Sequence, residues 1–327
     1  MHAVILAGGR GTRLRPLTDT RPKPLLPFAG DPFAAGLLRR LRDAGCAAAT
    51  FLVGQVAAPF QPLVALGDQL GIDVKVVTEP EPLDTAGAAR DLLRARTDGP
   101  FLVCNGDILT DLDYGVLVQR HHDAGAVATL ALTRVQDTST FGVVETDANG
   151  RVQRFVEKPP PGTLAADTIN AGTYVLSAEA FDGVADRGPL SFERAVFPHI
   201  VDSGRLLLGV ADDAFWMDLG TPDRYLGGQA AVLLGQCAWP IGDGFEQHGS
   251  VLVHRSATVD TALGECVVVG PRTVVDGDAS VTSAALFEDV SVGAGAQITG
   301  AIVGEGARLT TGARVHDTVV APGGVVG

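Results

Sequence analysis

Residues 4–27 read VILAGGRGTRLRPLTDTRPKPLLP, and this stretch decides the fold. It opens on an apolar run, residues 4–7, which predicts a buried parallel strand. Gly8, Gly9 and Gly11 follow the run, and glycines at a strand end let backbone N–H groups approach an anion because no Cβ stands in the way. The pattern therefore predicts a strand that ends in an anion-binding loop.

Fixed positive charges lie directly after these glycines. Arg10, Arg13 and Arg15 can each bind a phosphate bidentately, and Thr12 adds a hydroxyl. Lys23 stands between two prolines that stiffen its backbone. Each piece alone has a simpler interpretation, since a lone Gly-Gly-x-Gly is more often a turn and a surface cation is usually only solvated. Their combination favours a phosphate site that is neither Walker A nor a GxGxxG dinucleotide fingerprint.

Composition limits the class of protein. The chain has 327 residues and is 46% hydrophobic, which predicts two domains. Its net charge of −13 argues against a broad nucleic-acid-binding face. No apolar run reaches transmembrane length and no signal-peptide pattern is present, so we expect a cytoplasmic protein that binds no membrane. The four scattered cysteines form no CxxC pair, which predicts reduced thiols.

Strand and helix patterns alternate through the first two thirds of the chain. Apolar runs at 50–53, 74–78 and 101–105 predict further strands, and Asp31 and Pro32 resemble the N-cap and first position of a helix. Such alternation predicts an α/β fold, a Rossmann-like mixed and mostly parallel sheet with helices on its faces.

Two motifs together carry a family resemblance. LAGGRGTRLRPLT at 6–18 and RPKPLLP at 21–27 resemble the signature of the sugar-1-phosphate nucleotidyltransferases. The resemblance implies transfer of a nucleoside monophosphate from a nucleoside triphosphate to a sugar 1-phosphate, with release of pyrophosphate. It implies catalytic roles for Arg13, Lys23, Asp107 and Asp218. The nucleotide-binding residues that it implies are Leu6, Ala7, Gly8, Gly9, Gly11, Thr12, Arg13, Lys23, Thr85, Gly87 and Asp107.

Residues 81–87, EPLDTAG, read on their own as a loop-to-helix junction in which Thr85 caps the helix. A similar E-P-L-G-T-A-G element lies beside the nucleobase in guanylyltransferases of the family, which implies base contacts for Thr85 and Gly87. This chain has Asp84 where the glycine usually stands.

Asp107 follows the predicted strand at 101–105, and open parallel sheets bind ligands at the carboxyl ends of their strands. The simpler interpretation is a solvated loop carboxylate, which we prefer for Asp111 and Asp113. The resemblance assigns metal binding to Asp107 and, in the W-x-D-x-G-T-P motif, to Asp218. Two carboxylates with triphosphate oxygens and waters suit Mg²⁺.

Glu157-Lys158-Pro159 closes a predicted hairpin, in which Lys158 by itself reads as a plain surface lysine. The family resemblance implies that Lys158 pairs with the sugar phosphate and Glu157 with sugar hydroxyls. It also places Gly142 and Asn170 at the sugar phosphate.

The C-terminal part changes character, because aromatic residues almost vanish and apolar residues recur at steps of six. A six-residue repeat is typical of a left-handed parallel β-helix, here of roughly four coils with three hexads each; a β-sandwich is the alternative. We predict a catalytic domain over 1–235 and a β-helix over 236–327. The repeating positions are Val253, Val259, Val269, Val275, Val281, Phe287, Val292, Ile298, Val303, Leu309 and Val315.

Several segments resemble most closely the family members that use GTP and mannose 1-phosphate, namely 81–87, 141–145 and 215–226. The alternatives are thymidylyl or uridylyl transfer to glucose 1-phosphate or a related sugar or cyclitol phosphate, and a non-catalytic subunit that binds nucleotide sugars. An acyltransferase tail using His254 or His316 is less consistent with the regular repeat. All catalytic motifs precede residue 222, so we expect the tail to supply no reacting group. We expect it instead to pack on its own domain or on a second subunit of a homo-oligomer, a dimer or larger.

Overall fold

The structure is a computed structural model that describes residues 1–79, 81–95, 99–160 and 166–327. Its contacts divide the chain into two compact units. The first unit comprises Met1–Gly9, Leu41–Ile108 and Leu112–Trp216, and the second comprises Arg10–Arg40, Leu109–Asp111 and Met217–Gly327. The second unit therefore contains both the cationic part of the N-terminal stretch and the C-terminal tail. The predicted division at residue 235 follows the motifs and stays a prediction.

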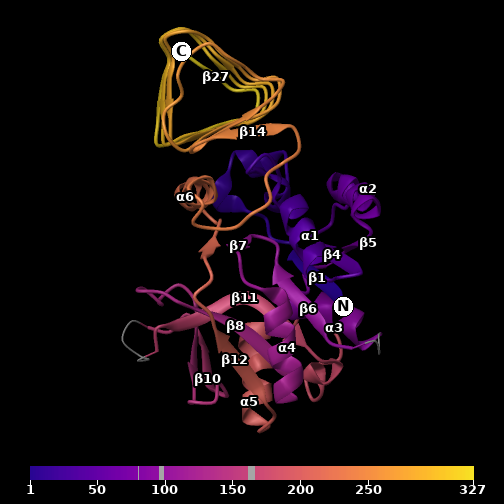
Figure 1. Ribbon diagram of the computed structural model, residues 1–327. Coiled ribbons are helices and arrows are strands. Elements are labelled where there is room, and N and C mark those ends of the chain that lie inside the picture. The colour runs from indigo at the N-terminus through magenta and orange to yellow at the C-terminus, as the bar shows by residue number, and fades with distance from the viewer. Residues whose placement is uncertain (80, 96–98, 161–165) are drawn as a thin grey trace. The chain divides into compact units, whose positions relative to one another are not determined.

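A mixed, mostly parallel sheet forms the first unit (Figure 1) and confirms the predicted fold class. Its main order is β10-β9-β11-β6-β1-β4-β5, and β8 joins β11 to β12. The run at residues 4–7 lies inside β1, which pairs in parallel with a strand on each side and is buried along most of its length. The strands are β1 (His2–Ala7), β4 (Ala48–Val53), β5 (Asp73–Thr78), β6 (Phe101–Asn105), β8 (Ala128–Arg134), β9 (Gly142–Thr146), β10 (Val152–Glu157), β11 (Thr168–Leu176) and β12 (Leu207–Ala211).

Four α-helices accompany this sheet within the described residues of the first unit. Aromatic side chains close the core beneath it, where Tyr174 contacts Phe197 and Phe192 stacks on Phe197. The helices are α2 (Gln61–Leu70), α3 (Asp84–Arg94), α4 (Tyr114–Ala124) and α5 (Phe197–Asp202), the last preceded by a π-helical turn at Phe192–Val196.

Two predicted helix starts are wrong. Asp31 and Pro32 form β3 (Asp31–Pro32), which pairs with β2 (Pro27–Phe28), and α1 (Phe33–Asp43) begins after them. Positive φ angles at Ala29 and Gly30 make a two-residue hairpin there, so local turn geometry prevails over the capping pattern. Thr85 does not cap α3, since the N-cap is Leu83 and the Thr85 hydroxyl donates instead to Glu193 Oε2 at 2.7 Å.

The tail coils into stacked parallel strands with a triangular outline (Figure 1), which excludes the sandwich. Val275 pairs with Val292 and Val292 with Leu309, a step of 17 residues per coil where three full hexads predict 18, and the first coil is shorter still, since Thr258 pairs with Val274. One side of the triangle is shorter, and Leu286 rather than Phe287 occupies the inner stack with Val269. The stacks are β14 (Phe245–His248), β15 (Val251–His254), β17 (Val267–Val269), β20 (Ala284–Leu286), β23 (Ile302–Val303) and β26 (Val319–Val320); β16 (Thr258–Val259), β18 (Val274–Val275), β21 (Ser291–Val292), β24 (Arg308–Leu309) and β27 (Val325–Val326); and β19 (Ser280–Thr282), β22 (Gln297–Thr299) and β25 (Arg314–His316).

The remaining elements connect motifs to the tail. Helix α6 (Pro222–Leu233) is capped by Thr221, whose hydroxyl accepts from Arg224 N, and the short strands β7 (Ile108–Thr110) and β13 (Trp216–Asp218) pair.

All four cysteines are free thiols, as predicted. No helix in the described part of the chain is long and apolar enough to cross a bilayer.

The buried His121 of α4 makes stability depend on pH. Its ring nitrogens lie 2.9 Å from Thr129 Oγ1 and 3.1 Å from Ser177 Oγ, and burial, with a smaller effect of His122, lowers its pKa to about 4. Between pH 6.5 and 4 the unfolded chain therefore binds a proton that the folded chain does not. We expect the free energy of unfolding to fall by up to about 3 kcal/mol across this window through His121.

Urea unfolding of the wild type and of His121→Gln at several pH values tests this. The variant should lose most of the pH dependence between 6.5 and 4, whereas His248→Gln, at an exposed position, should keep it. If the free energy of unfolding of His121→Gln depends on pH as it does in the wild type, His121 is not the group responsible.

Candidate active site

In the first unit, the carboxyl ends of β1 and β6 meet at one edge of the sheet. Leu6 pairs with Asn105, and Gly106 N donates to Leu6 O at 2.9 Å. A Cβ on Gly106 would lie only 2.9 Å from that carbonyl oxygen, so the turn requires glycine. It places Asp107 beside the end of β1, as the predicted ligand site requires.

Gly9 follows this strand end without a packing reason to be glycine. A Cβ there would meet no atom within 4 Å, and one on Gly8 would make only ordinary contacts, the nearest at 3.6 Å. Neither glycine has the positive φ that favours this residue type. The described fold would tolerate side chains here, which supports a ligand that approaches the backbone.

The predicted sugar-side residues, Gly142, Glu157, Lys158 and Asn170, come from three neighbouring strands of the first unit. Gly142 pairs with Glu157, and a Cβ on Gly142 would lie 2.9 Å from Glu157 Oε2. Burial, and then the nearby Glu193, raise the pKa of Glu157. Lys158 has a positive φ of 48° and a side chain that is 66% exposed, with Nζ 3.8 Å from Glu157 Oε1.

Asn170 is held by its own strand. Its Nδ2 donates to Tyr174 Oη at 2.8 Å, while Gly172 N donates to its Oδ1 at 3.0 Å. Gly172, at φ +72°, creates the irregularity in β11 that aims this amide, and a Cβ there would collide with Asn105. The structure thus brings the four sugar-side residues together on β9, β10 and β11.

In the second unit, three cations converge on the carboxylate of Asp218. Arg13 Nη2 lies 3.6 Å from Oδ2, Lys23 Nζ 3.5 Å from Oδ1 and Arg224 Nη1 3.3 Å from Oδ2. The side chains of Lys23 and Asp218 are only 10% and 16% exposed. Three cations gathered around one carboxylate can offer several donors to a polyanion, which favours such a ligand here.

Two glycines make room for this Asp218 cluster, which consists of Asp218, Arg13, Lys23 and Arg224. A Cβ on Gly220 would collide with the Arg13 guanidinium. Gly11 has a φ of +60°, and a Cβ added to it would lie 3.0 Å from the Cβ of Lys23. The glycines at 11 and 220 therefore serve the packing of the cations themselves.

Arg21 fixes the RPKP segment to the tail. Its guanidinium pairs with Glu288 at 2.7 Å and with Glu305, both carboxylates of the coiled tail. Tyr225 of α6 contacts Phe28 and Phe287 through their rings. The tail supplies no charge to the Asp218 cluster in the described contacts, but it holds the segment that carries Lys23.

The predicted base contacts have structural roles of their own. The Thr85 hydroxyl accepts from Phe192 N at 3.0 Å and donates to Glu193, and a Cβ on Gly87 would lie 3.1 Å from Gly188 O. Asp84, at φ +60°, binds Arg194 at 2.5 Å. The contribution of Thr85 and Gly87 to base recognition stays a prediction.

The sequence analysis missed Arg224 and Glu193. Arg224 lies in the first turn of α6, and the Thr221-Pro222 start of that helix was the available signal. Glu193 accepts from both Thr85 and Ser191, and only its position after Ser191 pointed to it.

Comparison with known proteins decides the family. A model of the nucleotidyl transferase family matches residues 2–234. The chain belongs to this family. A second model, the GMPPB C-terminal domain, matches residues 247–326, so both parts of this nucleotidyltransferase have known counterparts.

Relatives of this nucleotidyltransferase agree over most of its length. It is 37% identical to a mannose-1-phosphate guanylyltransferase of Mycobacterium tuberculosis, over 91% of this chain and 83% of the relative. It is 36% identical to a probable mannose-1-phosphate guanylyltransferase of Oryza sativa, over 84% and 76%. The crystal structure of HddC from Yersinia pseudotuberculosis complexed with GMP-PN matches with a TM-score of 0.59 at 28% identity, over 70% of this chain and 97% of HddC.

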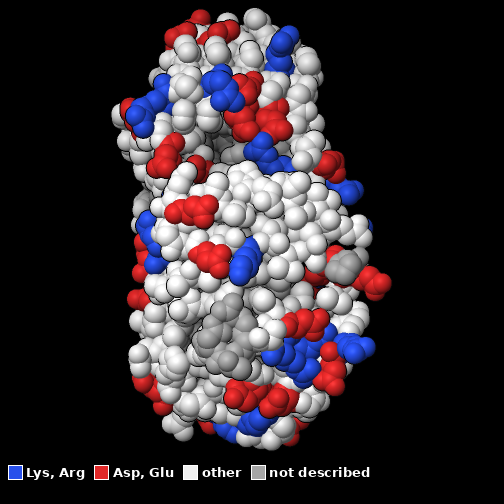
Figure 2. Space-filling view, turned by 90° about the vertical axis from the view of Figure 1, so that its right-hand side faces the viewer, with Lys and Arg blue, Asp and Glu red and all other residues white. Residues whose placement is uncertain are grey.

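Surface charge agrees with a small anionic substrate rather than a nucleic acid. On the face shown in Figure 2, basic side chains are interspersed with acidic ones instead of gathering in one broad basic area. The cations described above lie within one compact cluster.

Proposed function

We propose that the protein transfers GMP from GTP to mannose 1-phosphate, giving GDP-mannose and pyrophosphate. The convergence of Arg13, Lys23 and Arg224 on Asp218 carries the proposal, because it provides a built site for a polyphosphate. The named activity of the guanylyltransferase relatives supports the choice of base and sugar. A non-catalytic role finds no support, since Arg13, Lys23, Asp107 and Asp218 are all present.

The reaction needs placement more than proton transfer. An oxygen of the sugar phosphate attacks the α-phosphorus of GTP, and the bond from that phosphorus to the bridging oxygen breaks, releasing pyrophosphate. The attacking phosphate is already ionised at neutral pH, so no general base is required. Lys158 holds this nucleophile, Glu157 and Asn170 orient the sugar, and Arg13 and Lys23 stabilise the charge on the departing pyrophosphate.

A divalent metal, Mg²⁺ in our proposal, fits the carboxylate oxygens of Asp107 and Asp218 by donor type. The described residues contain no preformed group of three or more acidic, histidine or cysteine ligands. The cations around Asp218 would repel a free metal ion, so we propose that the metal enters with the triphosphate, whose charge offsets theirs. When bound, the metal neutralises charge on the nucleotide phosphates.

One panel of reactions tests the substrates. Pyrophosphate release is measured with GTP, dTTP, UTP and ATP, each combined with mannose 1-phosphate and glucose 1-phosphate. We expect the highest kcat/KM for GTP with mannose 1-phosphate. A preference for dTTP or UTP with glucose 1-phosphate shows the alternative instead, and no release with any pair shows that the protein is not catalytic.

The chain contains three lysines, Lys23, Lys75 and Lys158, which allows a matched experiment. Lys158→Ala should raise the KM for the sugar phosphate about tenfold, because that contact exists before and during reaction. Lys23→Ala should lower kcat by ~10²-fold, because negative charge on pyrophosphate grows in the transition state. Lys75→Ala, at a side chain that is 61% exposed, should change neither. A reversed pattern would mean that the two roles are exchanged.

We further propose a cytoplasmic homo-oligomer, a dimer or larger. The apolar side chain of Val325 in β27 is 71% exposed, and its burial in an interface would favour association.

A further inference from the structure

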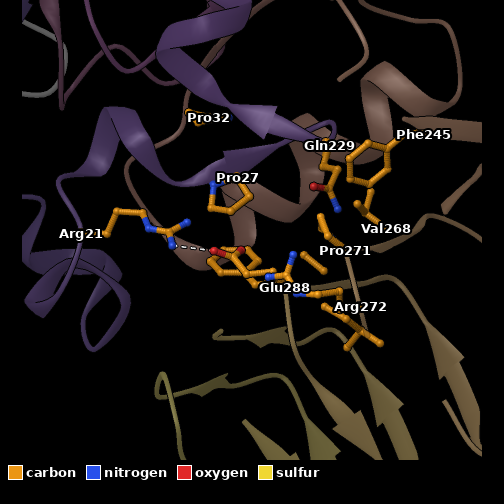
Figure 3. Close-up of a pocket in the computed structure, with 14 residues that line it drawn as sticks. Arg21, Pro27, Pro32, Gln229, Phe245, Val268, Pro271, Arg272 and Glu288 are labelled. Carbon is orange, nitrogen blue, oxygen red and sulfur yellow. Dashed lines mark hydrogen bonds and ion pairs between the residues drawn. The ribbon is translucent and has the colours of Figure 1, made fainter. Parts of the chain in front are cut away.

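A cavity of about 250 Å³ lies within the second unit, apart from the Asp218 cluster (Figure 3). It is bounded by the β2–β3 hairpin, by α6 and by the coils of the tail. The residues that line it are Arg21, Pro27, Gly30, Pro32, Gln229, Phe245, Val268, Gly270, Pro271, Arg272, Ala285, Leu286, Phe287 and Glu288.

Gln229 of α6 presents a buried donor to this cavity. The residue is 2% exposed, and its Nε2 has no hydrogen-bond partner among the described residues. Figure 3 shows the amide among the lining side chains, near Pro271 and Val268. A buried donor without a partner is destabilising, so such groups in native proteins are usually satisfied by water or a ligand.

The charges around the cavity are already balanced. Arg21 pairs with Glu288 and Glu305, and Arg272 pairs with Asp289 through two contacts of 2.6 Å. Two cations thus face three carboxylates, which disfavours an anion. Glu288 has acceptor sites beyond the one that Arg21 uses, because an ionised carboxylate offers about four.

Part of the lining is apolar and includes flat rings, those of Phe245, Phe287 and the prolines. Phe245 lies against Gly30, where a Cβ would come within 2.8 Å of its ring, and it also contacts His254, with ring centroids 4.9 Å apart. The volume is below the range typical of drug-sized ligands, about 300–1,000 Å³, which favours a ligand with one ring system.

We propose that this cavity binds a neutral, planar nitrogen heterocycle of about nucleobase size. Gln229 donates to an acceptor of the ring, Glu288 accepts from a ring N–H or amino group, and Phe245 and the prolines contact its apolar faces. This goes beyond the proposed transfer reaction. Arg21 lines the cavity and precedes Lys23 by two residues, so a bound ring contacts the segment that positions Lys23. The site would therefore regulate the activity that depends on Lys23.

Ligand-observed NMR titration of the full chain tests the proposal. The probes are adenine, guanosine, cytidine and nicotinamide, with inorganic phosphate and mannose as non-planar comparisons. Saturating inorganic tripolyphosphate without metal ion is present throughout, so that binding at the phosphate cluster is suppressed without adding a second heterocycle. We expect saturable binding of at least one heterocycle and of neither comparison compound.

Variants assign that binding to the cavity. Gln229→Leu should raise the Kd of the heterocycle about tenfold, which corresponds to one lost hydrogen bond. Gln236→Leu, at an exposed position, should leave this Kd unchanged. Ala285→Leu, which fills the cavity from the tail, should abolish binding and decides the question if Gln229→Leu does not fold. Absence of heterocycle binding, or binding that all three variants leave unchanged, overturns the proposal and leaves a hydrated cavity only.

Discussion

Asp218→Asn is expected to lower kcat by ~10³-fold or more while the protein stays folded. The carboxylate has two jobs that asparagine cannot fill. In our proposal it supplies a hard anionic oxygen to the metal, and in the ligand-free protein it contacts Arg13, Lys23 and Arg224 and helps to position them. Asp107→Asn should cause a comparable loss through the metal alone.

The two variants should differ in how they bind pyrophosphate without metal. Asp218→Asn removes the negative charge that opposes a phosphate within the cluster, so it should bind pyrophosphate more tightly than the wild type does. Asp107→Asn leaves the Asp218 carboxylate in place among these cations, so the affinity for pyrophosphate should change less. Calorimetric titration measures the affinity, and pyrophosphate release measures kcat.

Asp223→Asn is the matched control, since this exposed aspartate also lies in the first turn of α6. It should leave both quantities unchanged. If Asp218→Asn or Asp107→Asn shows near-normal turnover with Mg²⁺, that residue is not a ligand of the catalytic metal.

Removing the tail after Leu234 is expected to abolish activity, although every proposed metal and phosphate ligand remains in the shortened chain. The truncation deletes Glu288 and Glu305, the carboxylate partners of the half-buried Arg21. It also deletes Phe287, which contacts Tyr225, and Gln247, whose amide donates to Leu233 O at 3.0 Å. Loss of the ion pairs that anchor Arg21, together with exposure of the aromatic rings, should unfold the segment that carries Lys23.

A milder change separates positioning from folding. Glu288→Ala combined with Glu305→Ala should lower kcat/KM about tenfold or more with the fold retained, because RPKP loses its anchor. Asp289→Ala removes an equally acidic but exposed side chain of the same coil and should have no such effect. Circular dichroism, light scattering and pyrophosphate release are measured on all four chains. A truncated chain that is folded, of unchanged oligomeric state and active contradicts both the anchoring role and the proposal that the tail drives assembly.

Structure follows from sequence most directly where one short period governs it. The apolar runs at 4–7 and 101–105 predicted strands, which the structure pairs in parallel, and the glycine and aspartate after the second run lie at the edge where parallel strands place their ligands. The step of six predicted coils in the tail. Prediction failed where a neighbouring turn decided the backbone, as at Asp31, and where a distant carboxylate took the hydroxyl of Thr85.

The sequence by itself determined the α/β sheet, the coiled tail and the family, because periodicity and contiguous motifs are local properties of the chain. Only the tertiary structure decided that Arg13, Lys23 and Arg224 share one carboxylate, that Arg21 is anchored more than 260 positions away, and that the coils take fewer than 18 residues. These facts depend on long-range packing, in which the available volume and the nearest opposite charge select the partner. No local spacing encodes that choice, and the cavity beside Gln229 arises in the same way.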